Sequence, residues 1–347
     1  GMPDLNYRTP AVTEEMDTVI AFWLEEIGVD GFRLDAVRHL VEVDRALANT
    51  AETHTWLQGF REQYKTIASD AVTVGEIWDK SEVVSAYVQG NELDLAFNFD
   101  LASAWVLSAV SKDARPASFV LNRDLPAFQP GQFATFLTNH DQNRVMNQVN
   151  GEVLRAKTAA SLLLTAPGVP FLYYGEEIGM TGQKPDPEIR TPMQWNGEPG
   201  AGFTSGQPWH EINADAAEVN VAGQDGDPDS LFSRYRDLIH LRNAVPALRS
   251  ANAWLVETGD RGVYAVLRAD AQQAVLVVVN LDDEPVTEYA LTLESGPLQG
   301  GFAAANRYGA GDAPLPPLIA NTGGGFDSYQ PLPELTPGVV VVIELAP

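Results

Sequence analysis

Cysteine, basic side chains and long apolar runs are scarce or missing in this chain of 347 residues. The absence of cysteine excludes disulfides and thiolate metal sites. No window approaches 18 consecutive apolar residues, so no membrane-spanning helix is predicted. Lysine and arginine number 22 against 47 acidic residues, which gives a net charge of −25. This charge argues against nucleic acid or an anionic membrane as the main partner and favours a neutral substrate.

The apolar residues that are present, 45% of the chain, have the patterning of a folded globular protein. Between residues 22 and 179, short apolar runs alternate with longer periodic segments, which is typical of strands and helices around a parallel sheet. The predicted strands are 31–36, 72–77, 93–98, 133–137 and 169–174. The predicted helices are 13–27, 83–88, 102–110 and 154–164.

The C-terminal part of the chain has a different pattern. Residues 181–228 are rich in Gly, Pro, Asn and Asp, which predicts a long loop system, and a helix is predicted over 231–241 with Asp229 and Ser230 as its cap. Valine-rich segments follow at 262–267, 274–280 and 339–345. We therefore predict an α/β region over residues 1–250 and a small antiparallel β-sandwich domain over residues 251–347.

The first segment with candidate chemistry is Gly31-Phe32-Arg33-Leu34-Asp35-Ala36. Side chains alternate along a strand, so Arg33 and Asp35 share one face. An arginine beside a carboxylate favours the ionised form that a nucleophile requires. A buried ion pair that only braces the sheet explains this segment equally well.

A second predicted strand ends in Gly75-Glu76-Ile77-Trp78. A carboxyl group against apolar rings has a raised pKa, which suits a general acid. A lone Gly-Glu at a strand end is more often a helix cap or a surface ion-pair partner. A third strand is followed by Thr138-Asn139-His140-Asp141, which could bind a metal, clamp hydroxyl groups or only bond within its loop. All three motifs lie at the C-terminal ends of predicted strands, where parallel barrels gather catalytic groups.

Gly-Phe-Arg-Leu-Asp, Gly-Glu and Thr-Asn-His-Asp, in this order and spacing, resemble the α-amylase superfamily of glycoside hydrolases. Residues 2–6, 167–177 and 190–195 are also similar, so the resemblance covers essentially the whole chain. It implies a retaining mechanism with Asp35 as nucleophile, Glu76 as general acid and base, and Asp141 as the group that stabilises the transition state. Such a mechanism needs one ionised and one protonated carboxyl group about 5 Å apart.

The resemblance also implies residues that bind the substrate. Arg33 would position Asp35, while His39 and His140 would contact sugar hydroxyls. Trp78 and Arg144 complete the predicted binding residues, although ordinary packing explains Trp78 equally well. No residue is assigned to a metal, and the resemblance allows calcium in the full-length protein.

The family's barrel has eight strands, and the five predicted strands correspond to strands four to eight. The expected fold is therefore a partial (β/α)8 TIM barrel followed by the β-sandwich. Residues 2–6 resemble the motif that closes an inserted domain before strand four. We expect the exposed sheet edges at 31–36 and 169–174 to pair with another copy, which gives a homo-oligomer, and we expect little hydrolysis by this chain alone.

The expected substrate is an α-linked glucose oligosaccharide or polysaccharide, with no nucleic acid and no membrane as partner. Endo or exo action, α-1,4 or α-1,6 preference and the compartment stay open. Two alternatives are a transglycosylating relative and a non-catalytic carbohydrate-binding or assembly fragment. A metal-dependent hydrolase that uses His140 and Asp141 is a weaker alternative, because no second histidine lies at ligand spacing.

Overall fold

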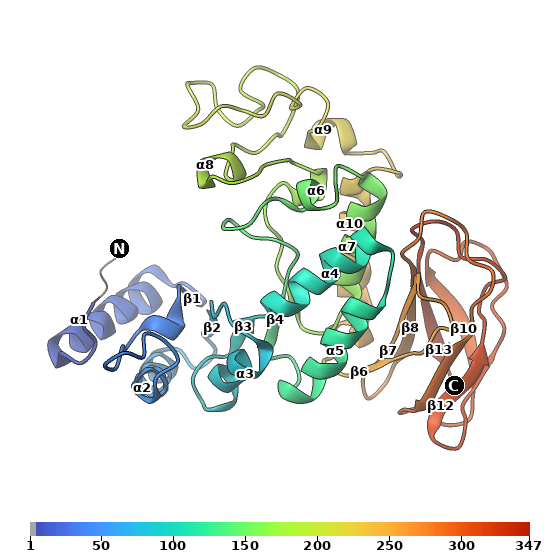
Figure 1. Cartoon of the computed structure of the whole chain (residues 1–347), viewed down its shortest axis with the longest axis horizontal. Helices are drawn as coiled ribbons and strands as arrows, with labels where there is room; N and C mark the ends of the chain where they lie inside the picture. Colours follow the sequence, from blue (N-terminus) through green and yellow to red (C-terminus); the bar gives the residue numbers. More distant parts are fainter. Residues whose placement is uncertain (1–4) are drawn as a thin grey trace. The chain divides into compact units, whose positions relative to one another are not determined.

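The computed structural model describes residues 5–347, and the chain divides into two compact units (Figure 1). The first unit consists of the chain up to Asp100 together with Asp124–Thr135. The second consists of Leu101–Arg123 and Phe136–Pro347. The sequence analysis noted a motif over residues 2–6. Its first three residues, Met2 to Asp4, lie outside the described residues. Within residues 5–347, no helix combines the length and the apolar composition needed to cross a membrane.

Four short parallel strands form the sheet of the first unit, in the order β1-β2-β3-β4. Their bounds are β1 Gly31–Leu34, β2 Val72–Gly75, β3 Leu95–Phe97 and β4 Phe133–Thr135. Each lies within a predicted strand, so these predictions are confirmed, with strands shorter than expected. The register pairs Leu34 of β1 with Gly75 of β2. The residues that follow these two strands therefore emerge at the same edge of the sheet.

The helices of the first unit are α1 Pro10–Ala21, which continues into the π-helical turn η1 Phe22–Ile27, then the 3-10 turn η2 Val37–His39, α2 Ala51–Ile67 and α3 Ser81–Gln89. The predicted helices over 13–27 and 83–88 are confirmed. Helix α2 was not predicted, although it buries Thr53, Leu57, Phe60 and Tyr64 at helical spacing. The hydroxyl of Thr50 caps it by accepting from the backbone N–H of Thr53 at 3.2 Å. The helix was missed because Thr53 and Tyr64, two of its buried residues, are polar and weaken the apolar pattern.

The second unit contains most of α4 Phe99–Ser111 and α5 Arg115–Ala127, together with α6 Val145–Gln148, α7 Val153–Thr165, β5 Val169–Pro170, η3 Glu176–Ile178, α8 Asp186–Ile189, α9 Val221–Gln224, α10 Leu231–Ala244 and α11 Pro246–Arg249. Helices α7 and α10 pack against each other. The predictions over 102–110, 154–164 and 231–241 are confirmed. Ser230 caps α10 as predicted, because its Oγ accepts from the backbone N–H of Ser233 at 3.0 Å.

Antiparallel β structure follows in the second unit. One sheet has the order β11-β10-β13-β8-β7-β6, and a second pairs β12 with β9. The bounds are β6 Ala253–Leu255, β7 Val263–Ala269, β8 Ala274–Asn280, β9 Leu291–Ser295, β10 Gly301–Tyr308, β11 Leu318–Ile319, β12 Gly324–Tyr329 and β13 Val340–Ala346. Leu276 and Ile343 of the large sheet share one core with Leu291 and Phe326 of the small sheet. The predicted antiparallel β region is therefore confirmed, and β7, β8 and β13 match the three valine-rich segments.

Two buried arginines connect this β structure to the helices of the same unit. Arg268 of β7 donates to the carbonyl of Thr165 at the end of α7 over 2.6 Å. Arg242 of α10 donates to the carbonyls of Leu164, Ala166 and Gly168. Burial lowers the pKa of Arg268 to about 9 and that of Arg242 to about 10. These guanidinium groups satisfy carbonyls that the end of α7 leaves without helical partners.

Candidate active site

The junction of β1 and β2 positions Asp35 and Glu76 in the first unit. The backbone N–H of Glu76 donates to the carbonyl of Leu34 at 2.9 Å, so the parallel pairing continues to the ends of both strands. Ala36 then adopts a left-handed backbone conformation with φ of 42°, which is uncommon for a residue with a side chain. Its N–H donates to Oε2 of Glu76 at 3.1 Å. The turn after β1 therefore holds the Glu76 carboxyl group beside the end of β1.

Arg33 contacts both carboxyl groups. Its Nη1 forms an ion pair with Oδ1 of Asp35, and its Nη2 donates to Oε2 of Glu76 at 2.6 Å. The predicted contact between Arg33 and Asp35 is present, and the contact with Glu76 was not predicted. The Asp35 side chain is 76% exposed, whereas that of Glu76 is 13% exposed. One guanidinium thus holds together two acidic groups, one open to solvent and one mostly enclosed.

Arg38 and Asp79 support the loops that follow these strands. Arg38 donates to the carbonyl of Trp78 at 2.5 Å and forms an ion pair with Asp79 at 3.0 Å. Asn49 donates to the same Asp79 carboxylate at 3.0 Å and accepts from the hydroxyl of Tyr87 at 2.7 Å. Neither Arg38 nor Asp79 was predicted as a site residue. Arg38 and Asp79 lie next to the predicted residues His39 and Trp78 in sequence. Their ion pair joins two loops, so the sequence of one loop alone does not indicate it.

Two predicted binding residues, His39 and Trp78, lie in the same unit. His39 is exposed, and its Nδ1 lies 2.7 Å from the carbonyl of Leu47, so one side of the ring is fixed by its own loop. Trp78 stacks on Phe99 with ring centroids 4.7 Å apart and an angle of 12° between the rings, and it is still 53% exposed. Trp78 therefore packs and also presents a free surface, and its role in binding stays a prediction.

Asp141 belongs to the second unit, in the loop after Phe136. Its Oδ1 contacts Nη2 of Arg190 at 2.9 Å, and its Oδ2 lies 3.2 Å from Nε2 of His140. Arg190 also donates from Nε to the carbonyl of His140 at 2.9 Å. His140 and Asp141 are thus brought together as expected from their adjacency, and Arg190 orients both. Arg190 was missed as a site residue, although it begins the segment 190–195 noted in the sequence.

Arg144 is buried in the same unit, with 1% of its surface exposed. Its Nη1 donates to the carbonyl of Tyr174 at 2.6 Å, and its guanidinium carbon lies 4.7 Å from the ring centres of Tyr173 and Tyr174. Such cation–π contacts stabilise an enclosed guanidinium. Arg144 therefore contacts residues of its own chain, and direct binding of substrate by Arg144 stays a prediction.

Glu176 is a buried acid that the sequence analysis did not single out. Burial raises its pKa to about 8, and the hydroxyl of Tyr235 donates to its Oε1 at 3.2 Å. Oε2 of Glu176 and two guanidinium nitrogens of Arg144 are also buried and have no partner within residues 5–347. Across these described residues, no group of three or more His, Asp or Glu side chains could hold a metal ion.

Comparison with known proteins adds to this geometry. Residues 1–251 match the family described as the catalytic domain of alpha amylase. The chain belongs to this α-amylase family. It is 34% identical to Alpha-amylase 3 of Dictyoglomus thermophilum over 285 residues, which cover 81% of this chain and 55% of that protein. It is 29% identical to an Oligo-1,6-glucosidase of Halalkalibacterium halodurans, over 80% of this chain and 61% of that one.

Solved structures give the same family assignment. The crystal structure of an α-amylase from H. orenii matches with a TM-score of 0.78 and 32% identity, and the match covers 99% of this chain and 66% of that one. The chain therefore has an α-amylase-type fold with α/β content and a C-terminal β domain. It spans between 55% and 66% of the length of these three relatives.

Proposed function

We propose that the protein is a retaining α-glycoside hydrolase that acts on α-linked glucose oligosaccharides or polysaccharides. Asp35 is the nucleophile, Glu76 the general acid and base, and Asp141 the carboxylate that stabilises the transition state. The observation that carries the proposal is the contact of one guanidinium, that of Arg33, with both Asp35 and Glu76. Retention of configuration requires two carboxyl groups close enough for one to attack while the other donates a proton.

The reaction has two steps. The exposed Asp35 carboxylate attacks the anomeric carbon, the bond to the leaving sugar breaks, and Glu76 transfers its proton to the departing oxygen. Glu76 then takes a proton from water, which attacks the same carbon and releases Asp35. Arg33 and the N–H of Ala36 hold the Glu76 carboxyl group in place.

The remaining site residues are proposed to bind the sugar. Arg190 and His140 hold the Asp141 carboxylate in a fixed orientation, which suits a group that accepts hydrogen bonds from hydroxyls. The free ring edge of His39 and the exposed face of Trp78 would contact the sugar near Asp35. Arg144 would act indirectly, by holding the backbone of Tyr174 in place.

We further propose that residues 1–250 form the catalytic region and residues 251–347 a separate β domain. The family match over residues 1–251 and the change to antiparallel strands after α11 support this division. The catalytic region is proposed to be a partial (β/α)8 barrel in which β1 to β5 correspond to strands four to eight. The parallel order of β1 to β4 supports it.

The outer edge of β1 is the proposed contact in a homo-oligomer. Strand β1 lies at the end of its sheet order, and unpaired edges favour pairing with another chain. Light scattering on this chain is expected to give a mass above 37.6 kDa. A monomer mass at all concentrations would contradict the edge contact.

Release of reducing sugar from maltotriose and starch tests the function, measured for this chain and for the full-length gene product. NMR of the first product anomer is expected to show the α form, because double displacement retains configuration. Appearance of the β anomer would overturn the mechanism. Products longer than maltotriose would indicate a transglycosylating enzyme, and binding without any turnover of the full-length protein would favour a non-catalytic carbohydrate-binding role.

A further inference from the structure

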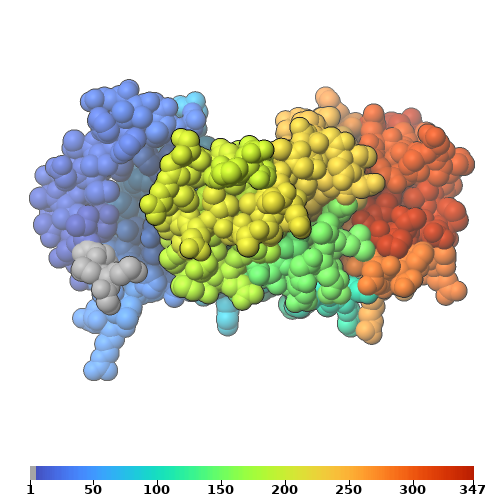
Figure 2. Space-filling view, turned by 90° about the horizontal axis from the view of Figure 1, so that it is seen from above, coloured from blue at the N-terminus to red at the C-terminus, as the bar shows by residue number. Residues whose placement is uncertain are grey.

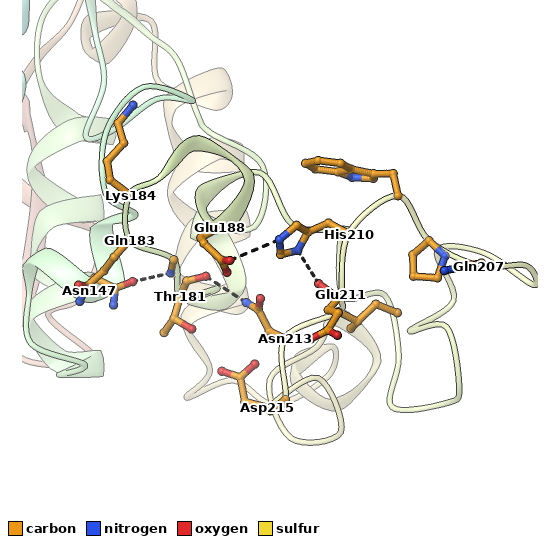
Figure 3. Close-up of a pocket in the computed structure, with 15 residues that line it drawn as sticks. Asn147, Thr181, Gln183, Lys184, Glu188, Gln207, His210, Glu211, Asn213 and Asp215 are labelled. Carbon is orange, nitrogen blue, oxygen red and sulfur yellow. Dashed lines mark hydrogen bonds and ion pairs between the residues drawn. The ribbon is translucent and has the colours of Figure 1, made fainter.

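A cavity of about 1170 Å³ lies in the second unit, and none of the residues that line it is a predicted site residue (Figure 3). Its lining comes from three parts of the chain: Asn147 of α6, the segment 181–188 and the segment 207–215. The last two belong to the loop system over 181–228, whose atoms form a broad exposed surface, drawn yellow-green to yellow in Figure 2. None of the functional roles above uses this cavity.

We propose that this cavity is a second sugar-binding site, which holds glucose residues of an α-linked chain by stacking on Trp209. The Trp209 side chain lines the cavity and is 61% exposed, among the largest exposures of an aromatic residue in residues 5–347. A large apolar ring that faces solvent inside a polar cavity is a typical feature of a binding site. The apolar C–H face of a pyranose matches such a ring.

The segment beside Trp209 is held in place. The rings of Trp209 and His210 lie 5.3 Å apart. Both nitrogens of His210 have partners, with Nδ1 at 3.0 Å from the carbonyl of Glu211 and Nε2 at 3.5 Å from Glu188, as the dashed lines in Figure 3 show. On the other side, Asn213 donates to the carbonyl of Thr181 at 3.0 Å. The backbone that carries Trp209 is thus tied to α8 and to residue 181, so little order has to be gained on binding.

The charged lining disfavours anionic ligands. Glu188, Glu211 and Asp215 outnumber Lys184, so the cavity disfavours phosphate and other anions. The side-chain amides of Gln183 and Gln207 make no hydrogen bond to another group within residues 5–347, which leaves donors and acceptors for hydroxyl groups. A ligand with one apolar face and many hydroxyls fits both parts of the lining.

Helix α8 connects the cavity to Asp141. Asp186 contacts Arg190 at 2.8 Å, and Arg190 contacts Asp141 at 2.9 Å. Glu188, two residues further along α8, lines the cavity. Residues two apart on a helix face in different directions. Asp186 therefore points towards Arg190 on one side of α8, and Glu188 points towards the cavity on the other. The choice of α-linked glucose as the sugar rests on the proposed function, whereas the stacking site itself rests on the cavity.

Calorimetric titration of the chain with maltoheptaose tests the proposal, with the Asp35→Asn variant so that no ligand is consumed. Trp209→Ala is expected to weaken binding by about tenfold or more, which corresponds to loss of one stacking contact. Phe203→Ala is the matched control, because Phe203 is an exposed aromatic residue of the same loop system that does not line the cavity. It should bind as the parent does, and cellohexaose, which is β-linked, should bind at least about tenfold more weakly.

The double variant Gln183→Ala/Gln207→Ala covers the case in which Trp209→Ala fails to fold. Its substitutions remove two side-chain amides that make no hydrogen bond to other groups within residues 5–347. It is expected to weaken maltoheptaose binding severalfold with an unchanged melting temperature. Equal affinities of the parent, Trp209→Ala and the double variant would overturn the second site, as would a parent that does not bind maltoheptaose. Binding that depends on Trp209 in a full-length protein without hydrolysis would reject the proposed function and retain this site.

Discussion

The two groups of candidate catalytic residues differ in how the fold builds them. Asp35 and Glu76 follow neighbouring parallel strands, and one arginine from the same strand as Asp35 contacts both. Asp141 lies in a loop of the other unit, and its carboxylate is held by Arg190, which is 49 positions further along the chain. Strand alternation makes the contact of Arg33 with Asp35 visible in sequence, whereas the contacts of Arg33 with Glu76 and of Arg190 with Asp141 arise only when the chain folds.

The largest expected effect concerns Asp35 and Glu76, the pair of carboxyl groups that follow the parallel strands. Glu76→Gln in the full-length gene product should lower kcat for maltotriose by about 100- to 10,000-fold, because the amide cannot donate the proton to the leaving sugar. Release of reducing sugar measures it. Glu62→Gln on the exposed face of α2 is the control and should leave kcat unchanged. Similar rates for the two variants would remove Glu76 from the mechanism.

The arginines of the two groups sharpen the comparison directly. Arg33→Ala should lower kcat by about 100-fold with a smaller change in KM, since it disturbs the nucleophile and the acid together. Arg190→Ala should raise KM and lower kcat less than Arg33→Ala does, because Asp141 is proposed to hold sugar hydroxyls as well as to stabilise the transition state. Steady-state kinetics of both variants separates these patterns. Unchanged turnover of Arg33→Ala would reduce Arg33 to a structural brace.

Arg33→Lys provides a further control on the same contact. A single ammonium lacks the planar fork that allows two nitrogens to reach two carboxyl groups. We expect it to restore only part of kcat. Full recovery would mean that charge alone, and not the double contact with Asp35 and Glu76, is what Arg33 supplies.

Stability provides a comparison between a buried contact and a half-exposed ion pair. Arg268→Met should lower the free energy of unfolding by about 3 kcal/mol, because the buried carbonyls of Thr165 and Ser250 lose their donor. Arg307→Met, which removes a half-exposed ion pair with Glu344, should cost less than about 1 kcal/mol. Urea unfolding of both variants measures the difference. Equal losses would contradict a bracing role for Arg268.

The last comparison is a pH dependence at Glu176. Burial raises its pKa from 4.5 to about 8, against the opposing effect of Arg144 and with Glu177 and Tyr235 nearby. Between these two values the unfolded chain ionises this carboxyl group while the folded protein keeps it protonated. Its stabilising contribution is complete below about pH 4.5 and is lost towards pH 8, with a slope of at most about 1.4 kcal/mol per pH unit.

The Glu176→Gln variant tests this directly, because the amide cannot ionise. Its stability relative to the parent should rise as the pH is raised from 5 to 8, measured by urea unfolding at several pH values. A constant difference across this range would show that Glu176 does not titrate as its burial implies.

Several features of this protein follow from its sequence alone. Alternation of Arg33 and Asp35 on one strand face requires no long-range information, and it predicted their contact. The positions of β1 to β5 and of β7, β8 and β13 follow from short apolar runs between turn residues, because burial on a sheet imposes that pattern. The ends of the parallel strands β1 to β5 were overestimated, since the residues after each of them leave the sheet.

Only the tertiary structure decided which distant groups meet. The contact of Arg33 with Glu76 depends on the register between β1 and β2, and that of Arg190 with Asp141 on the path of a long loop. The burial of Arg144 beneath two tyrosines and the raised pKa of Glu176 arise from surroundings contributed by several segments. Sequence periodicity reports which face of one element is buried, but it carries no information on which element covers that face.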